Sequence, residues 1–422
     1  MTTATPDQSK LGPRATATSW STSLKAALDR PLTSYYLLVS ASALLLTIGL
    51  IMVLSASSVY AFKQTGNSYS TAERQLMWVL IGIPCAWLAS RLPESFIRRL
   101  AWPGYIVAVL LLAATQVPGL GKTVNGNTNW LGVGPFVIQP AEVAKLALIL
   151  WAAHVFALKE RRLGDWRQAM IPVVPGFLLA AGLVVVGRDL GTALVFVAVM
   201  GGLLWGVGLS MRIFGLGFTV VGVGALWMAT TNSERRARLL TFTDPFKDFH
   251  YTGWQPAHGL YALSRGGWFG QGIGASQQKW GDLPEAHTDF IFAVLGEELG
   301  LVGTLLVLAL FLTIAYAAIR VALHTDRPFV RYTSFGIVIW LLGQMMINVG
   351  MVLTLLPVIG IPLPLISYGG SALVPSLVAL GLLIGFARRE PEAAAALAAR
   401  RKRRSAGLSA SGMLRRTAGW RS

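Results

Sequence analysis

Long apolar runs alternate with short polar segments along most of this chain. Most runs hold roughly 17–27 residues, the length at which an α-helix crosses the apolar core of a bilayer. We therefore predict an all-α polytopic membrane protein. Its ten transmembrane helices are expected over residues 35–61, 75–92, 102–118, 141–158, 169–187, 190–208, 213–231, 289–323, 329–356 and 371–387.

Composition supports this prediction. The chain of 422 residues is 54% hydrophobic and only 13% charged, whereas soluble proteins carry about 25% charged residues. The recurring apolar runs favour one helical bundle over several soluble domains. We expect an N-terminal tail over 1–30, a ten-helix membrane domain over 31–391 and a basic C-terminal tail over 392–422.

The net charge of +17 follows the predicted topology. Segments predicted to lie inside hold 25 Lys and Arg residues, against ten in the outside segments, with Lys145 inside a span. Cytoplasmic loops carry such an excess, so both termini are expected in the cytoplasm and no nucleic-acid partner is implied. The cluster RRKRR at 400–404 is either a solvated tail or a contact for anionic lipids or a cytosolic partner. Cys85 is the only cysteine, which excludes an intrachain disulfide.

Three segments predicted on the outer face are too rich in Gly, Pro and Trp for simple connectors. They are 119–140, the large loop 232–288 between the seventh and eighth spans, and 355–372. The last contains three prolines and three glycines and cannot be a regular helix. Irregular backbone at membrane depth must be buried in protein or line a wet cavity. We expect the chemistry on this face.

The stretch LPEAHTDFIFAVLGEELG at 283–300 places charges at the mouth of an apolar helix and inside it. From the pattern, Asp289 either caps this helix or has a function. Glu297 lies about 12 Å deeper, and both Glu297 and Glu298 are expected to have structural partners. Small residues at 293, 296, 300 and 303 share one helix face and predict the close approach of another helix.

Two further groups of residues could carry charge chemistry. Gln139, Glu142 and Lys145 share a helix face, where Glu142 and Lys145 form either a structural pair or a phosphate contact. Arg235 and Arg238 belong either to a solvated charge run or to an anion clamp. Asp244 and Asp248 could bind a divalent cation, although no tight carboxylate cluster surrounds them.

The motifs together resemble the SEDS family (shape, elongation, division, sporulation) of peptidoglycan glycosyltransferases, with the division branch closer than the elongation branch. The departures are Asn129, where the family usually has Arg, and Arg188, where it often has Pro. The motifs that carry the resemblance are LSASSVYA (54–61), NGNTNWLGVG and IQPAEVAKL (125–146), RDLGTA (188–193), RRARLLTFTDP (235–245), GWFGQGIGASQQKWGDLPEAHTDFIFAVLGEELGLVG (267–303) and LPLISYGGSA (363–372).

The resemblance implies an enzyme of the cytoplasmic membrane that joins lipid II units into β-1,4 glycan strands on the outer face during cell division. It implies that Asp289 is the catalytic base of an inverting reaction and that Lys145, Arg235, Arg238 and Lys279 stabilise the leaving pyrophosphate. It also implies localisation at the division septum, with a class B penicillin-binding protein and other divisome proteins as partners. The further substrate-binding candidates are Gln139, Glu142, Ser276, Gln278, Glu285, His287, Ser367, Gly369 and Gly370.

Two alternatives stay open on the sequence. A lipid II flippase would also use a polytopic bundle with a buried Lys–Glu pair, but it predicts polar residues through the membrane depth. A scaffold that recruits the penicillin-binding protein would not need Asp289. No protein cofactor is fixed by the sequence, and a divalent cation on the pyrophosphate is an open alternative without assigned ligands.

Overall fold

The computed structural model describes residues 22, 30–124, 127–133, 136–231, 236, 242, 244–281 and 283–399. A helix coincides with each of the ten predicted spans. These helices are α2 (Thr33–Thr65), α3 (Ser70–Arg91), α4 (Glu94–Ala114), α5 (Pro140–Lys159), α7 (Val173–Val186), α8 (Leu190–Gly206), α9 (Met211–Thr231), α12 (Ile291–Leu323), α13 (Pro328–Val352) and α14 (Gly370–Ala387). Two short helices, η2 (Glu160–Arg162) and α6 (Trp166–Met170), lie between α5 and α7.

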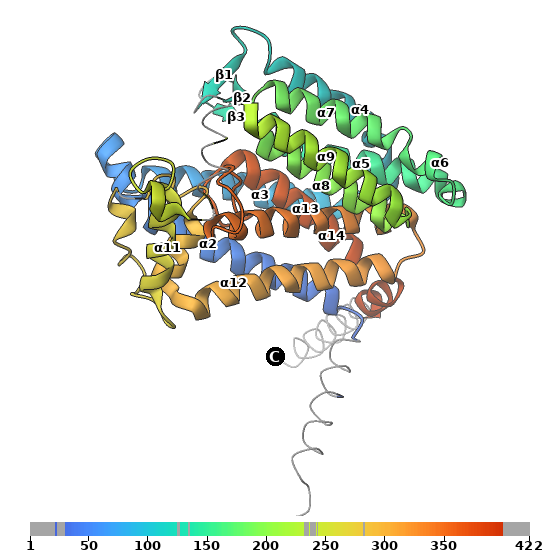
Figure 1. Ribbon diagram of the computed structural model, residues 1–422. Helices are drawn as coiled ribbons and strands as arrows, with labels where there is room; N and C mark the ends of the chain where they lie inside the picture. The colour runs from blue at the N-terminus through green and yellow to red at the C-terminus, as the bar shows by residue number, and fades with distance from the viewer. Residues whose placement is uncertain are drawn as a thin grey trace, which may run out of the picture.

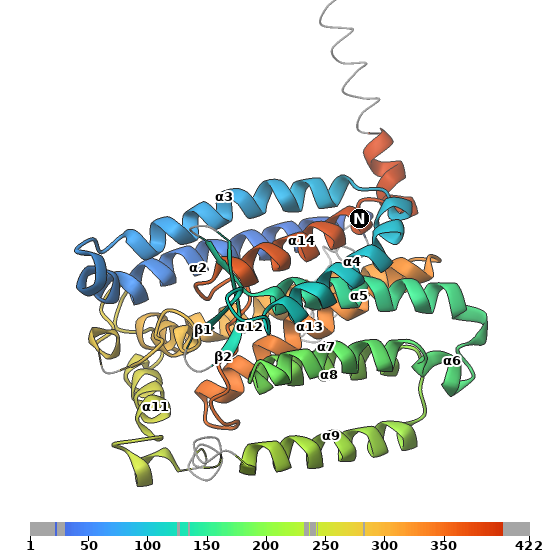
Figure 2. The same cartoon turned by 90° about the horizontal axis from the view of Figure 1, so that it is seen from above.

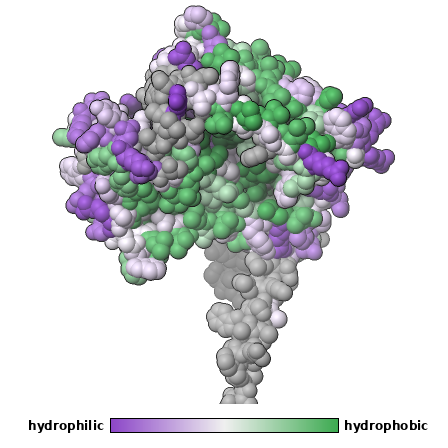
Figure 3. Space-filling model, viewed as in Figure 1, coloured by the Kyte–Doolittle hydropathy of each residue, from purple (hydrophilic) through white to green (hydrophobic). Residues whose placement is uncertain are grey.

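The helices run side by side in one bundle (Figures 1 and 2). Among the described residues, seven stretches are long and apolar enough to cross a membrane, and α8 and the first part of α9 are shorter apolar helices. Figure 3 shows hydrophobic residues across the middle of the molecule and hydrophilic ones gathered at its two ends. The fold is therefore that of a mostly helical, polytopic membrane protein, while the count of ten spans stays a prediction.

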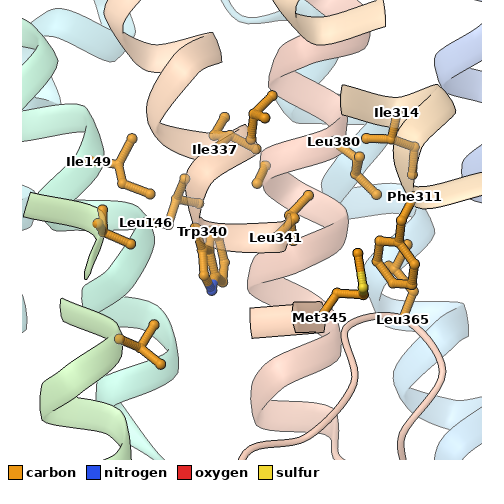
Figure 4. Packing of buried hydrophobic residues seen from close by; sticks show 14 of the residues in the cluster. Leu146, Ile149, Phe311, Ile314, Ile337, Trp340, Leu341, Met345, Leu365 and Leu380 are labelled. Atoms are coloured by element: carbon orange, nitrogen blue, oxygen red, sulfur yellow. The ribbon is translucent and has the colours of Figure 1, made fainter. Parts of the chain in front are cut away.

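Helix α13 lies at the centre of the bundle and packs against α5, α8 and α12. Trp340 and Leu341 of α13 are each 1% exposed, and Figure 4 shows them between side chains of α5, α12 and α14. Gly336 of α13 lets Ile149 of α5 approach so closely that an added Cβ would stand 2.7 Å from it. Without water to drive helices together, such close packing stabilises a membrane bundle.

A three-stranded antiparallel sheet, absent from the prediction, lies in the segment between α4 and α5. Its strands are β1 (Gly121–Val124), β2 (Asn127–Val133) and β3 (Phe136–Ile138), in the order β1-β2-β3. Strands of three to seven residues are too short to show clear alternation of apolar and polar positions in the sequence. The sheet is attached to the bundle where Thr128 N donates to Gly187 O at 3.0 Å.

The large segment between α9 and α12 is ordered where the structure describes it. It contains η3 (Pro245–Asp248), α11 (Trp254–Gly266) and η4 (Gln278–Trp280), and α11 packs against α12. Figure 1 shows α11 at one end of the bundle, beside the start of α12. This is the end that also carries the sheet and the irregular segment 353–369.

Helix α12 is broken at Gly300, where φ is 67° and ψ is −167°. The segment 266–272 fills the break with four backbone hydrogen bonds. Gln271 N and Gly272 N donate to the carbonyls of Glu297 and Glu298, while Leu301 N and Val302 N donate to the carbonyls of Gly267 and Trp268, at 2.9–3.1 Å. The stripe of small residues predicted the close approach of another helix. Leu263 of α11 does lie against Gly296, whereas the close neighbour of Gly300 is this non-helical segment.

The segment 353–369 has no regular secondary structure, again as predicted. Ile361, Leu363, Leu365 and Ile366 are each at most 2% exposed. The second half of the segment, 361–367, is thus mostly buried in protein, which is how irregular structure is tolerated at membrane depth, whereas 353–360 is exposed or half-buried.

We predict that Gly300→Ala destabilises the protein by about 1–3 kcal/mol. An added Cβ would stand 2.3 Å from Gly270 N and would force a non-glycine residue into positive φ. The measurement is the thermal unfolding midpoint of purified protein in detergent. The control is Gly343→Ala in α13, where no atom stands within 4 Å of the added Cβ. Equal midpoints for the two variants would contradict the role assigned to the break.

Candidate functional site

Asp289 lies in a turn two residues before α12 begins, at Ile291. Asn348 of α13 donates to the Asp289 carbonyl at 2.8 Å and to the Ile361 carbonyl at 2.7 Å, so one buried amide fixes both the turn and the segment 353–369. The Asp289 carboxylate faces that segment, because a Cβ on Gly360 would stand 3.3 Å from its Oδ2. Within the described part of the chain, no group donates a hydrogen bond to this carboxylate, so the capping alternative is not realised.

Ser367 joins the segment 353–369 to the Asp289 turn. Its hydroxyl donates to the Thr288 carbonyl at 2.7 Å and accepts from Leu363 N at 2.7 Å. The next residue, Tyr368, donates its backbone N–H to the His287 carbonyl at 3.0 Å. These bonds hold the turn and the irregular segment as one unit.

Gly369 and Gly370 form the junction between this segment and α14. Gly369 has φ of +152°, and its N–H donates to Gln75 Oε1 of α3 at 3.2 Å. A Cβ on Gly370 would stand 2.1 Å from the Trp78 ring. Both glycines are thus explained by backbone geometry and close packing.

His287 and Glu285 flank Asp289 in the same turn. The His287 ring stacks on Tyr60 of α2 at 5.0 Å between centroids and lies 5.6 Å from the Tyr368 ring. Burial lowers the pKa of His287, and the negative charge of Glu285 opposes this shift. Glu285 is exposed, has φ of +54°, and accepts a hydrogen bond from Thr288 Oγ1 at 2.6 Å.

The electrostatic environment of Asp289 disfavours its ionised form. Burial raises the pKa of Asp289 to about 7, and the negative charges of Glu285 and Asp189 add to the shift. An acid with a pKa near neutral pH can accept a proton from a substrate and return it to water. The turn therefore presents a carboxyl group suited to acid–base chemistry.

Asp189 was not among the candidate residues, although it lies in the RDLGTA motif. It caps α8 by accepting from Thr192 N at 2.9 Å. Its Oδ2 also accepts from Asn129 at 2.6 Å and from Gln139 at 3.3 Å. Asn129 and Arg188 are the two departures from the family pattern, and Asn129 binds Asp189, the residue after Arg188. This hydrogen bond connects the sheet to the start of α8.

Lys145 and Glu142 form a buried ion pair. Lys145 Nζ donates to Glu142 Oε1 at 2.7 Å and to Gln344 Oε1 at 3.0 Å, and the Lys145 side chain is 1% exposed. Gln344 in turn donates to the Pro362 carbonyl at 3.0 Å. Gln344 thus connects the ion pair to the segment 353–369. This is the structural pair that the sequence offered as one of two alternatives for Glu142 and Lys145.

The candidates Ser276, Gln278 and Lys279 contact Glu297 and Glu298. Ser276 Oγ donates to Glu297 Oε2 at 2.6 Å, and Lys279 Nζ donates to Glu298 Oε1 at 3.0 Å. Both glutamates are at most 1% exposed, so each has the structural partners that the sequence predicted.

The remaining contacts of this group are also internal. Lys279 Nζ donates to Ser55 Oγ at 2.9 Å and to the Gly274 carbonyl at 2.7 Å. Gln278 Oε1 lies 2.7 Å from His258 Nδ1. All three donor positions of the Lys279 ammonium are therefore used.

Arg235 and Arg238 lie outside the described residues. Asp244 pairs with Lys247 at 3.3 Å, and Asp248 Oδ2 accepts from Thr252 Oγ1 at 2.5 Å. In the described ranges, no group of three His, Cys, Asp or Glu residues is arranged to hold a metal ion.

Comparisons with known proteins show which family the chain resembles. The family model FTSW_RODA_SPOVE, described as "Cell cycle protein", matches residues 35–391. The "Probable peptidoglycan glycosyltransferase FtsW" of Mycobacterium tuberculosis is 40% identical over 374 residues, covering 89% of this chain and 71% of the relative. The "Stage V sporulation protein E" of Bacillus subtilis is 37% identical over 354 residues, covering 83% and 96%.

Two solved structures share the fold. One, from a study of "Structural coordination of polymerization and crosslinking by a peptidoglycan synthase complex", has a TM-score of 0.68 and 28% identity, covering 84% of this chain and 97% of that chain. The other is the Rod shape determining protein RodA of Thermus thermophilus, with a TM-score of 0.62 and 28% identity, covering 84% and 96%.

We predict that Asp289→Asn stabilises the protein, and that the gain grows as the pH rises from about 4 to about 7. In that range the folded state keeps a proton that the unfolded state releases, so the stability of the wild type falls with rising pH. A gain of about 2 kcal/mol in the free energy of unfolding is expected above pH 7. This is roughly half of the free energy that corresponds to the full pKa shift, because the carboxylate is partly exposed. The measurement is the thermal midpoint against pH. Asp244→Asn, at an exposed carboxylate, is the control, and a pH-independent gain for Asp289→Asn would contradict the prediction.

Proposed function

We propose a specific reaction for this chain, which belongs to the FTSW_RODA_SPOVE family of cell cycle proteins and is a glycosyltransferase. In this proposal it polymerises lipid II on the outer face of the cytoplasmic membrane during septal wall synthesis. The observation that supports this most directly is the Asp289 carboxylate. It is partly exposed, accepts no hydrogen bond from the described residues, and has a pKa raised to about 7.

Asp289 acts as the general base in the proposed reaction. It takes the proton from the 4-hydroxyl of the acceptor GlcNAc while that oxygen attacks the anomeric carbon of the growing chain. The bond from this carbon to the undecaprenyl pyrophosphate breaks, and the pyrophosphate leaves with the electron pair. One carboxylate suffices, because direct displacement inverts the α-linkage to β without a covalent enzyme intermediate and the pyrophosphate leaves as an anion without a general acid.

The neighbouring residues have positioning roles in this proposal. The hydrogen bonds of Ser367 and Asn348 keep the carboxylate at a fixed place. The uncharged form of His287, favoured by burial, and the stacked Tyr60 ring offer an apolar wall with hydrogen-bonding edges for a sugar.

Charge stabilisation of the leaving group is assigned to Arg235 and Arg238. Lys145 and Lys279 are buried and already paired with carboxylates, so their contribution would be to the shape of the site. A divalent cation on the pyrophosphate belongs to the proposal without assigned protein ligands. A class B penicillin-binding protein and other divisome proteins are the proposed partners, and the division septum the proposed location.

We predict that Asp289→Asn abolishes glycan-strand formation. The assay uses the full chain with its cognate class B penicillin-binding protein and labelled lipid II, and the strands are resolved on a gel. Loss of a general base lowers such rates by about 10²–10⁴-fold. Asp165→Asn, at an exposed carboxylate that caps the short helix α6, is the control and should keep wild-type activity.

Three other outcomes would redirect the proposal. Equal polymer from wild type and Asp289→Asn would exclude Asp289 as the base. No polymer from either, with lipid II moving between vesicle leaflets, would indicate a flippase. Normal growth of cells carrying only Asp289→Asn would indicate a scaffold.

A second prediction concerns the pH profile. Activity should rise with pH, reach about half of its maximum near pH 7 and level off above that, as Asp289 loses its proton. Asp189→Asn removes one of the negative charges that raise the Asp289 pKa, so the rising limb should move to lower pH. An unchanged limb, with the protein still folded by thermal melting, would contradict the electrostatic coupling between the two residues.

A further inference from the structure

A pocket of about 220 Å³ lies at the other end of the bundle from Asp289. It opens where the start of α4, the turn 324–327 and the end of α14 meet. The 33 residues of α12 separate it from the Asp289 turn, roughly 50 Å at the rise of an α-helix. The distribution of Lys and Arg predicts that this end is cytoplasmic, so the pocket is not part of the proposed glycosyltransferase site.

The wall of the pocket carries charges of both signs. Arg327 pairs with Glu94 at 3.4 Å, and Arg389 donates to the Ser90 carbonyl at 3.3 Å. Both guanidinium groups keep further N–H donors for a ligand, since each has five. Burial lowers the pKa of Arg389, and the neighbouring charges of Arg388 and Arg327 add to this shift. The carboxylates Glu94 and Asp326 also line the pocket, and Glu94 pairs with Arg327. Arg389 has no ion pair among the described residues, so it is the main group on this wall for binding an anion.

Glu390, on the same wall, needs a hydrogen-bond donor rather than an anion. Its Oε1 is buried and has no hydrogen-bond partner in the described ranges. Burial raises the pKa of Glu390, against the opposing charges of Arg320 and His324. A buried carboxylate oxygen without a donor is destabilising, and a ligand with a cationic N–H group would satisfy it.

The apolar part of the wall comes from Val321, Val330 and Phe386. These residues belong to α12, α13 and α14, helices long and apolar enough to cross a membrane. Their side chains are buried and form the floor of the pocket. The pocket lies where these apolar helices give way to polar helix ends, which is the level of lipid headgroups. Pockets between helices on the cytoplasmic side are known sites for lipid headgroups.

We propose that this pocket binds the headgroup of an ethanolamine phospholipid, with the ammonium on Glu390 and the phosphate on Arg327 and Arg389. A primary ammonium donates hydrogen bonds to a carboxylate, whereas the quaternary ammonium of choline has no N–H. A phosphatidylglycerol headgroup supplies the phosphate but no cation. The pocket therefore selects ethanolamine lipids over both.

The test is native mass spectrometry of the purified full chain, after incubation with equal amounts of phosphatidylethanolamine, phosphatidylcholine and phosphatidylglycerol. The wild type should retain one ethanolamine lipid with about tenfold preference over choline lipid, the effect of one charge-assisted hydrogen bond. Glu390→Gln should remove this preference. Arg389→Gln should weaken retention of all three lipids and leave the ethanolamine-to-choline ratio unchanged.

The control variant is Glu160→Gln, which removes a carboxylate from the same end of the bundle. Glu160 pairs with Arg331 at 3.1 Å and does not line the pocket, so this variant should keep the lipid preference. An ethanolamine-to-choline ratio near one in the wild type, or an unchanged ratio in Glu390→Gln, would overturn the proposal. Retention of a synthetic peptide of residues 398–406 in place of lipid would assign the pocket to a basic peptide instead.

Discussion

The break in α12 at Gly300 is the constraint on which the arrangement of the outer end depends. A helix interrupted inside an apolar bundle exposes backbone groups that lipid cannot satisfy. The segment 266–272 supplies the four missing hydrogen bonds, and the carboxylates of Glu297 and Glu298 then bind the segment 274–279 that follows. Because α12 begins just after Asp289, the same helix that anchors the outer segment also fixes the candidate catalytic carboxylate.

The buried charges separate into two kinds. Lys145 and Lys279 are each within 3.0 Å of a carboxylate oxygen and of a neutral acceptor. Each lysine and its carboxylate partner together carry no net charge, so these pairs are structural. Removing one partner of such a pair would leave an uncompensated buried charge, at a cost of about 3–5 kcal/mol. Asp289 differs because only like charges and burial act on it. Among the carboxylates at this end, it is the one arranged for exchange of a proton with a ligand.

The sequence predicted more of the helices than of the contacts. Apolar length alone locates the ten helices, and three prolines in 355–372 predict the irregular segment. The sheet over 121–138 was not predicted, because its strands are defined by pairing rather than by their own periodicity. Lys279 was expected near the pyrophosphate, since a sequence shows a cation but not the partner, Glu298, that the fold brings to it. Asp189 was overlooked for the same reason: its neighbours Asn129 and Gln139 come from 60 and 50 residues away.

Asp289 and Glu390 are both carboxyl groups to which no described residue supplies a needed hydrogen bond, at opposite ends of one bundle. A protein interior does not tolerate such a group unless water or a ligand completes it. At the outer end the carboxylate faces an irregular, preorganised segment and has a pKa near neutrality, which suits a reacting hydroxyl that must lose a proton. At the inner end Glu390 lies just beyond the end of α14, and an ammonium group can donate the hydrogen bond that its Oε1 lacks. A carboxyl group without a hydrogen-bond donor therefore indicates catalysis at one end of the bundle and ligand recognition at the other. The difference comes from the neighbours of each carboxyl group.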